Sequence, residues 1–77
     1  MEYLVNNYTT NQEFTIYGNK SLDMYLKSYR IDTIENRYKG ESCVPYSIET
    51  LEIIAEEEIV LLTGENAHIE VQMQWVK

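Results

Sequence analysis

Hydrophobic and polar residues alternate along the segment from Ala67 to Val76, with Val76 alone breaking the pattern before the final lysine. Such alternation is typical of a β-strand with one buried and one exposed face. An apolar run at 59–62 precedes it, separated by a glycine-containing turn at 63–66. These segments predict an antiparallel hairpin. The strand's inward face would carry four residues: Ile69, Val71, Met73 and Trp75.

A second, shorter alternation covers residues 13–17 and predicts another strand, with turns before and after it. The next segment, 22–31, fits two patterns equally well. As a strand it places Leu22, Met24 and Leu26 on one face. As a helix capped by Ser21 it has an apolar stripe at spacings of three and four residues. We take the strand as the first interpretation and a helix over about 21–31 as the alternative.

Two further stretches resemble each other: YRIDTIEN at 29–36 and YSIETLEI at 46–53. The residue types that the two stretches share are explained most simply by two neighbouring strands that pair across the intervening turn. As an alternative, the second stretch begins a helix over about 47–57, capped by Ser47. Apolar residues on one face would then be Ile48, Leu51 and Ala55.

Composition also favours strands, since Val, Ile, Thr, Tyr, Phe and Trp make up 28 of 77 residues and Ala only two. We therefore expect one small domain, 1–77, that is mainly β. It would be an antiparallel meander of five to six strands curled into a barrel or sandwich. The alternative is an α+β fold with one or two short helices at about 21–31 and 47–57. A core of this size gives little net stability, which makes a homo-oligomer, such as a dimer, a reasonable expectation.

The net charge is −7, with thirteen acidic residues against six basic ones. Nucleic acid and anionic membranes would repel such a chain, so a basic protein is the favoured partner and direct nucleic-acid or membrane binding is not expected. One cysteine, no signal-peptide pattern and no long apolar run lead us to expect a cytoplasmic location. This would be the bacterial cytoplasm, or that of the host cell for a phage-encoded protein.

Residues with catalytic chemistry are few. His68 and Cys43 each lack partners at the spacing that a metal site or nucleophilic centre needs. The glycines are too scattered to hold a phosphate. We expect no cofactor, no metal and no enzymatic activity.

The acidic residues and tyrosines remain as candidates for partner binding. Our hypothesis is a small acidic protein-binding module, in its sharpest form a phage or mobile-element inhibitor that imitates nucleic-acid phosphates. The alternative is a structural or assembly subunit that oligomerises through its β-strands, with the C-terminal strand as the pairing edge. The predicted partner-binding residues are Tyr29, Asp32, Tyr46, Glu49, Glu52, Glu56, Glu57 and Glu58.

Overall fold

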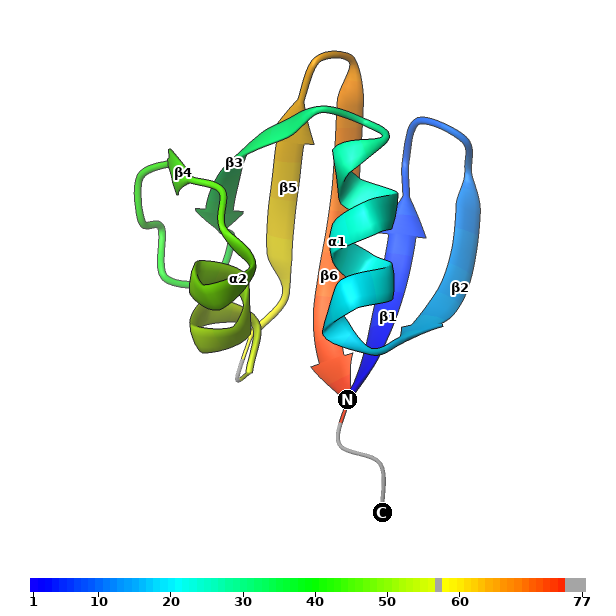
Figure 1. Cartoon of the computed structure of the whole chain (residues 1–77). Coiled ribbons are helices and arrows are strands. Elements are labelled where there is room, and N and C mark those ends of the chain that lie inside the picture. Colours follow the sequence, from blue (N-terminus) through cyan, green and yellow to red (C-terminus); the bar gives the residue numbers. More distant parts are fainter. Residues whose placement is uncertain (57, 75–77) are drawn as a thin grey trace.

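A computed structural model describes residues 1–56 and 58–74 of the chain. Within them the strands form one six-stranded antiparallel sheet in the order β2-β1-β6-β5-β3-β4 (Figure 1). The elements, in chain order, are β1 (Glu2–Asn7), β2 (Gln12–Tyr17), α1 (Asn19–Lys27), β3 (Ile31–Asn36), β4 (Val44–Pro45), α2 (Ile48–Ala55), β5 (Val60–Gly64) and β6 (Ala67–Gln74). The mainly β antiparallel fold is thus confirmed, together with the two short helices of the α+β alternative.

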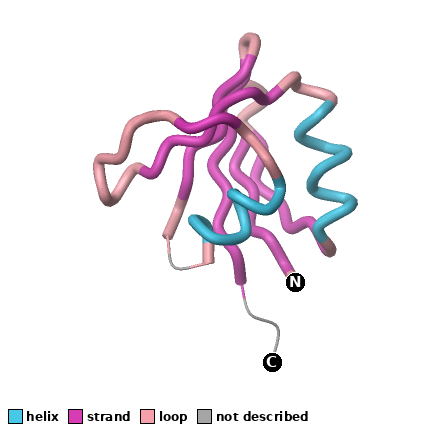
Figure 2. The backbone as a smooth tube through the Cα atoms, turned by 60° about the vertical axis from the view of Figure 1, so that its left-hand side comes forward, coloured by secondary structure: helices cyan, strands magenta, loops and turns pink. Residues whose placement is uncertain are grey.

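Both helices cover the same face of the sheet (Figures 1 and 2). The core lies between the helices and this face, where the inward side chains of the central strands alternate with outward ones. In the described residues β2 and β4 each pair with one neighbour, so the sheet is open and not closed into a barrel. The buried apolar residues are Tyr3, Val5, Leu22, Leu26, Ile34, Leu51, Ala55, Val60, Leu62, Ala67, Ile69, Val71 and Met73.

The hairpin predicted near the C-terminus is confirmed as β5 and β6, and the described inward residues of β6 are buried. Trp75 and Val76 lie outside the described residues. Gly64 ends β5 where the chain approaches β3 closely: a Cβ there would lie 2.4 Å from the carbonyl oxygen of Arg30. The expectation that the C-terminal strand offers a free edge is wrong, because β6 lies between β1 and β5.

The strand interpretation of residues 22–31 is wrong, because α1 occupies most of this segment. Leu22 and Leu26 are fully buried on the sheet, whereas Met24 is 64% exposed. A strand would have placed all three side chains on one face. The helix begins after Gly18, whose φ of 87° suits glycine, and the expected cap at Ser21 is not used.

The second of the two similar stretches is also a helix, α2, and the strand interpretation fails there too. Ser47 caps it as the alternative predicted: its side chain accepts a hydrogen bond from the backbone N–H of Thr50 at 3.1 Å. Leu51 and Ala55, four residues apart, are buried. The helix ends at Ala55, so the run of glutamates begins where the helix stops.

The first stretch forms β3, but its predicted pairing with a strand at 46–53 is wrong: β3 pairs instead with β4, which ends just before the second stretch. The pairing is short: β4 contributes two residues, and the N–H of Tyr46 donates to the carbonyl of Asp32 at 2.9 Å. The chain then leaves the sheet at Ser47 to start α2.

Neither helix of the described chain has the length and apolar character needed to cross a membrane.

Candidate functional site

The outward surface of α2 combines an exposed apolar side chain with several carboxylates. Burial of Leu51 and Ala55 fixes the inward side of the helix, so residues at other angles face solvent. Ile53 is 76% exposed, more than any other large hydrophobic side chain of the described residues. We call the following residues the acidic α2 surface: Glu49, Glu52, Ile53 and Glu56.

The three glutamates of this surface lie at spacings of three and four residues, which puts them along one side of the helix. Glu49 and Glu56 are exposed and Glu52 is half-buried. The helix contains no lysine or arginine, and the ion pairs found among the described residues involve none of these carboxylates. Within the described part of the chain, the ion pairs found thus leave out these three carboxylates.

A hydrogen-bonded chain fixes α2 against the rest of the fold. The Tyr3 hydroxyl donates to the side-chain oxygen of Asn19, and the Asn19 amide donates to Glu52. The phenol is fully inside the core cluster, and burial, helped by the negative charge of Glu52, raises the pKa of Tyr3. Glu52 thus holds α2 next to the start of α1 while its neighbours Glu49 and Glu56 stay in solvent.

The two predicted tyrosines, in contrast, contribute mainly to internal packing. The Tyr46 hydroxyl donates to Asp23 of α1 at 3.2 Å, and burial, followed by the charge of Asp23, raises the pKa of Tyr46. Tyr29 is half-buried, and its ring meets the ring of Tyr25 edge-on with centroids 5.2 Å apart. Both rings are half-buried, so neither forms part of an exposed surface together with the glutamates of α2.

The remaining predicted acids are Asp32, Glu57 and Glu58. Asp32 is exposed, and its carbonyl bond to Tyr46 brings its backbone close to the N-terminal end of α2. Glu58 forms an ion pair with Lys39 at 3.1 Å, and its other carboxylate oxygen is buried without a hydrogen-bond partner among the described residues. Glu57 lies outside the described residues.

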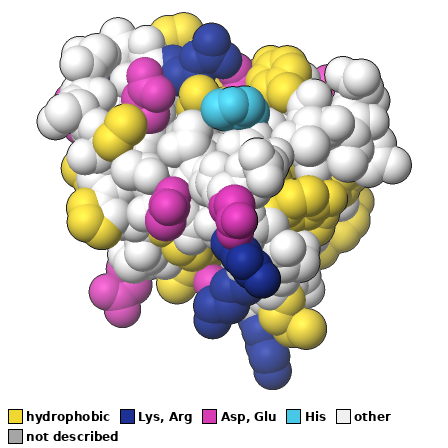
Figure 3. Space-filling model, turned by 90° about the horizontal axis from the view of Figure 1, so that it is seen from above, with side chains coloured by type: hydrophobic (Ala, Val, Ile, Leu, Met, Phe, Trp, Pro, Cys, Tyr) yellow, Lys and Arg dark blue, Asp and Glu magenta, His cyan; other side chains and the backbone are white. Residues whose placement is uncertain are grey.

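Elsewhere the charges are mixed. Figure 3 shows the end of the molecule that carries the exposed His68, with acidic and basic side chains both present. One acid of the β5–β6 turn, Glu65, is paired with Arg30 at 2.9 Å. Basic side chains lie beside the acidic ones at this end of the molecule, whereas helix α2 itself carries no basic side chain.

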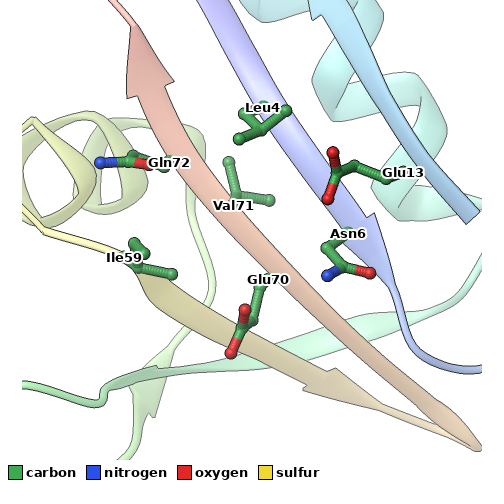
Figure 4. A pocket seen from close by; sticks show the side chains of 7 residues that line it. All are labelled: Leu4, Asn6, Glu13, Ile59, Glu70, Val71 and Gln72. Atoms are coloured by element: carbon green, nitrogen blue, oxygen red, sulfur yellow. The ribbon is translucent and has the colours of Figure 1, made fainter.

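The open face of the sheet carries a shallow hollow of about 200 Å³ across β1, β6 and the start of β5 (Figure 4). Glu70 lies at its rim, accepting hydrogen bonds from the Tyr8 hydroxyl at 2.8 Å and from Arg37. The bond to Glu70 is the main reason that the pKa of Tyr8 is raised. The hollow is smaller than the roughly 300–1,000 Å³ of small-molecule sites, and its best-placed carboxylate is already occupied by these partners. The residues lining it are Leu4, Asn6, Glu13, Ile59, Glu70, Val71 and Gln72.

In the described residues no group of three or more His, Cys, Asp or Glu side chains is arranged to hold a metal ion. Cys43 and His68 are both exposed.

Sequence reasoning identified the glutamates of α2 but missed Ile53. A strand would have placed Ile53 on the same face as Leu51, inside the core. Only the helical period turns it outward among the glutamates. Serine at the cap position was the one local signal that pointed to this arrangement.

No protein-family model matches the chain, and neither a curated protein nor a solved structure matches it.

Proposed function

We propose that this chain is a small protein-binding module that holds a basic partner protein against the acidic α2 surface. The observation that carries the proposal is the exposed Ile53 beside a row of glutamates on its own helix, of which Glu49 and Glu56 are exposed. The binding itself needs no catalytic group on this chain.

Protein interfaces commonly combine an apolar centre with a polar rim, and a few central side chains supply most of the binding energy. Ile53 has the position of such a centre, and Glu49, Glu52 and Glu56 have the positions of the rim. A fitting partner has an apolar pocket bordered by lysine or arginine. Asp32 is close enough to the start of α2 to extend the rim in that direction.

The net charge of −7 supports a basic partner, because opposite charges accelerate encounter and disfavour acidic competitors. In its sharpest form the proposal is charge mimicry: the glutamates occupy positions that nucleic-acid phosphates would take on the partner, as an inhibitor from a phage or mobile element would do. The helical rise places successive glutamates about 4.5 and 6 Å apart along the axis. One strand of DNA carries a charge about every 3.4 Å, so the stripe would imitate a short, sparse phosphate row.

The test compares two triple variants with the same change in net charge. The first replaces Glu49, Glu52 and Glu56 with glutamine, which preserves size and keeps an acceptor for the Asn19 amide. The matched control replaces three acids on other elements with glutamine: Glu13, Glu35 and Glu41. Wild-type and variant proteins are immobilised and used to capture partners from a bacterial lysate at low and moderate salt.

We expect the wild type and the control to retain the same basic protein at low salt, with less retained as salt screens the charges. The α2 variant should lose it. Equal loss in both variants would mean that total charge, and not this surface, drives the retention. Salt-insensitive capture that survives the α2 substitutions would refute the proposal.

A further inference from the structure

We propose that a second copy of this chain pairs antiparallel with the outer edge of β2, joining two sheets into one across a two-fold axis. Strand β2 is at one edge of the sheet, and β3 and β4 are at the other edge. The proposed pairing does not depend on the acidic α2 surface. It concerns strand β2, which pairs with β1 on one side and with no described strand on the other.

The backbone groups that face outward can be assigned from the hydrogen bonding. The N–H of Gly18 donates to the carbonyl of Met1 at 2.9 Å, so this pair is a hydrogen-bonded pair of the β1–β2 ladder. Such pairs alternate along an antiparallel ladder. Phe14 and Ile16 therefore bond to β1, and the backbone groups of the alternate residues point away from it. These outward residues are Glu13, Thr15 and Tyr17.

The next ladder supports this assignment. The N–H of Tyr8 donates to the carbonyl of His68 at 2.9 Å, so alternate residues of β1, including Leu4 and Asn6, bond to β6. That leaves Tyr3 and Val5 to bond β2, opposite Ile16 and Phe14. The outer edge of β2 is thus a row of backbone donors and acceptors without strand partners in the described chain.

Protected edges normally carry proline, lysine, a bulge or a covering element. β2 has the sequence QEFTIY, with one charged residue, and its pairing with β1 runs in regular register without a bulge. In Figure 1 no described helix or strand covers this edge. At the other end of the sheet the edge strand β4 is two residues long and contains Pro45, which makes it a poor template. The two edges are therefore unequal, and only β2 is suited to pairing.

A two-fold axis at Thr15 is the register that uses all of the outward backbone groups. It sets Thr15 opposite Thr15 of the second copy, and Glu13 opposite Tyr17 of that copy. Each hydrogen-bonded pair exchanges two bonds, giving about six in all. The acid then faces a phenol, so the register avoids placing Glu13 against its own equivalent, which like-charge repulsion would disfavour.

Side chains near this edge have apolar surface that a second copy would cover. Tyr17 is 67% exposed. On the helix side, Phe14 and Ile16 are only half-buried, and the Phe14 ring meets the ring of Tyr25 of α1 edge-on at 5.2 Å. In the joined sheet Phe14 would lie opposite Ile16 of the other copy, which extends the apolar face under both α1 helices. A core this small gains substantially from such burial.

The charge of the chain gives the association a distinctive salt response. Two copies with a net charge of −7 each repel, and salt screens that repulsion. Self-association should therefore strengthen with salt, opposite to the weakening expected for a basic partner on α2.

The test measures the mass of the wild-type protein by analytical ultracentrifugation from micromolar to millimolar concentration. We expect it to rise from 9.1 kDa to twice that value, at lower concentration when salt is added. Thr15→Pro removes one outward N–H group that no described strand uses, and Thr15→Lys sets two like charges face to face across the axis. Each should weaken the dimer at least tenfold. Ser42→Lys, on an exposed loop, makes the same charge change and should leave the dimer intact.

Amide hydrogen exchange reports on the same edge. The amides of Glu13, Thr15 and Tyr17 should exchange more slowly as protein concentration rises, whereas those of Phe14 and Ile16 should be protected throughout. A protein that stays at 9.1 kDa at millimolar concentration overturns the proposal. So does a dimer that resists Thr15→Lys. If the circular dichroism spectrum shows that Thr15→Pro is not folded like the wild type, the dimer proposal is judged on Thr15→Lys and the exchange data alone.

Discussion

Replacing Leu51 and Ile53 separately with alanine gives opposite predictions for a helix and for a strand. In a strand the two side chains share a face, so both losses would cost similar stability. In α2 they point in different directions: Leu51 is fully buried and Ile53 is 76% exposed. Only Leu51→Ala should therefore be severe.

The magnitude follows from the burial. Leu51→Ala removes three carbon atoms from the core, worth about 2.4 kcal/mol at ~0.8 kcal/mol each, and the cavity left behind raises the cost to as much as about 5 kcal/mol. Domains of this size have a net stability of about 3–5 kcal/mol, so the variant should lose half or more of it. Ile53→Ala should change the free energy of unfolding by no more than about 0.5 kcal/mol.

Urea unfolding followed by circular dichroism measures both effects. With a slope of about 1 kcal/mol per molar urea, Leu51→Ala should lower the midpoint by about 2 M or more, while Ile53→Ala leaves it nearly unchanged. Similar losses in the two variants would show that residues 48–55 do not form the helix on which the acidic α2 surface depends.

Three further substitutions test individual contacts. Ser47→Ala should cost about 1 kcal/mol through loss of the α2 cap, and Ser47→Asp should restore most of it in the same urea assay. Gly64→Ala should cost about 1–3 kcal/mol because its Cβ would lie 2.4 Å from the Arg30 carbonyl oxygen; an unchanged midpoint would show that β3 and β5 are farther apart. Because folding raises the pKa of Tyr46 above its ordinary value near 10, stability should be fully present below pH 10 and fall above it, as the unfolded chain loses this proton first. Tyr46→Phe should make that fall shallower in urea titrations at increasing pH, and identical pH profiles would contradict the assignment.

The C-terminal hairpin could be predicted from sequence because β6 alternates over its whole length and faces a helix layer on one side only. The helices were harder to predict for a physical reason. Residues four apart lie on one face in a helix and in a strand alike, so Leu22 with Leu26, and Leu51 with Ala55, fit both periods. The residues that discriminate are Met24 and Ile53, which are hydrophobic yet exposed.

The similarity of 29–36 and 46–53 shows how far context outweighs local sequence. One stretch becomes β3 because the neighbouring strand β5 pairs with it across the sheet. The other begins after Pro45 and a serine cap at the end of the sheet, where a strand has no further partner and a helix can bury Leu51. Propensity alone is too weak to separate these outcomes.

The candidate site was predictable in its charge but not in its shape. The glutamates at 49, 52 and 56 could be named from sequence, whereas their alignment around Ile53 depends on the helical period. The free edge of β2 could not be found, because which strands are central and which are outermost is set by long-range pairing between β1 and β6.

The most direct test of the acidic α2 surface is the dissociation constant of the captured basic partner, measured calorimetrically with wild type, Ile53→Ala and Tyr38→Ala. Tyr38 is 70% exposed in the turn after β3 and serves as the control. A central side chain contributes more than about 1 kcal/mol, so Ile53→Ala should weaken binding at least about fivefold, with Tyr38→Ala unchanged. An Ile53→Ala protein that keeps the wild-type dissociation constant would contradict the proposed function.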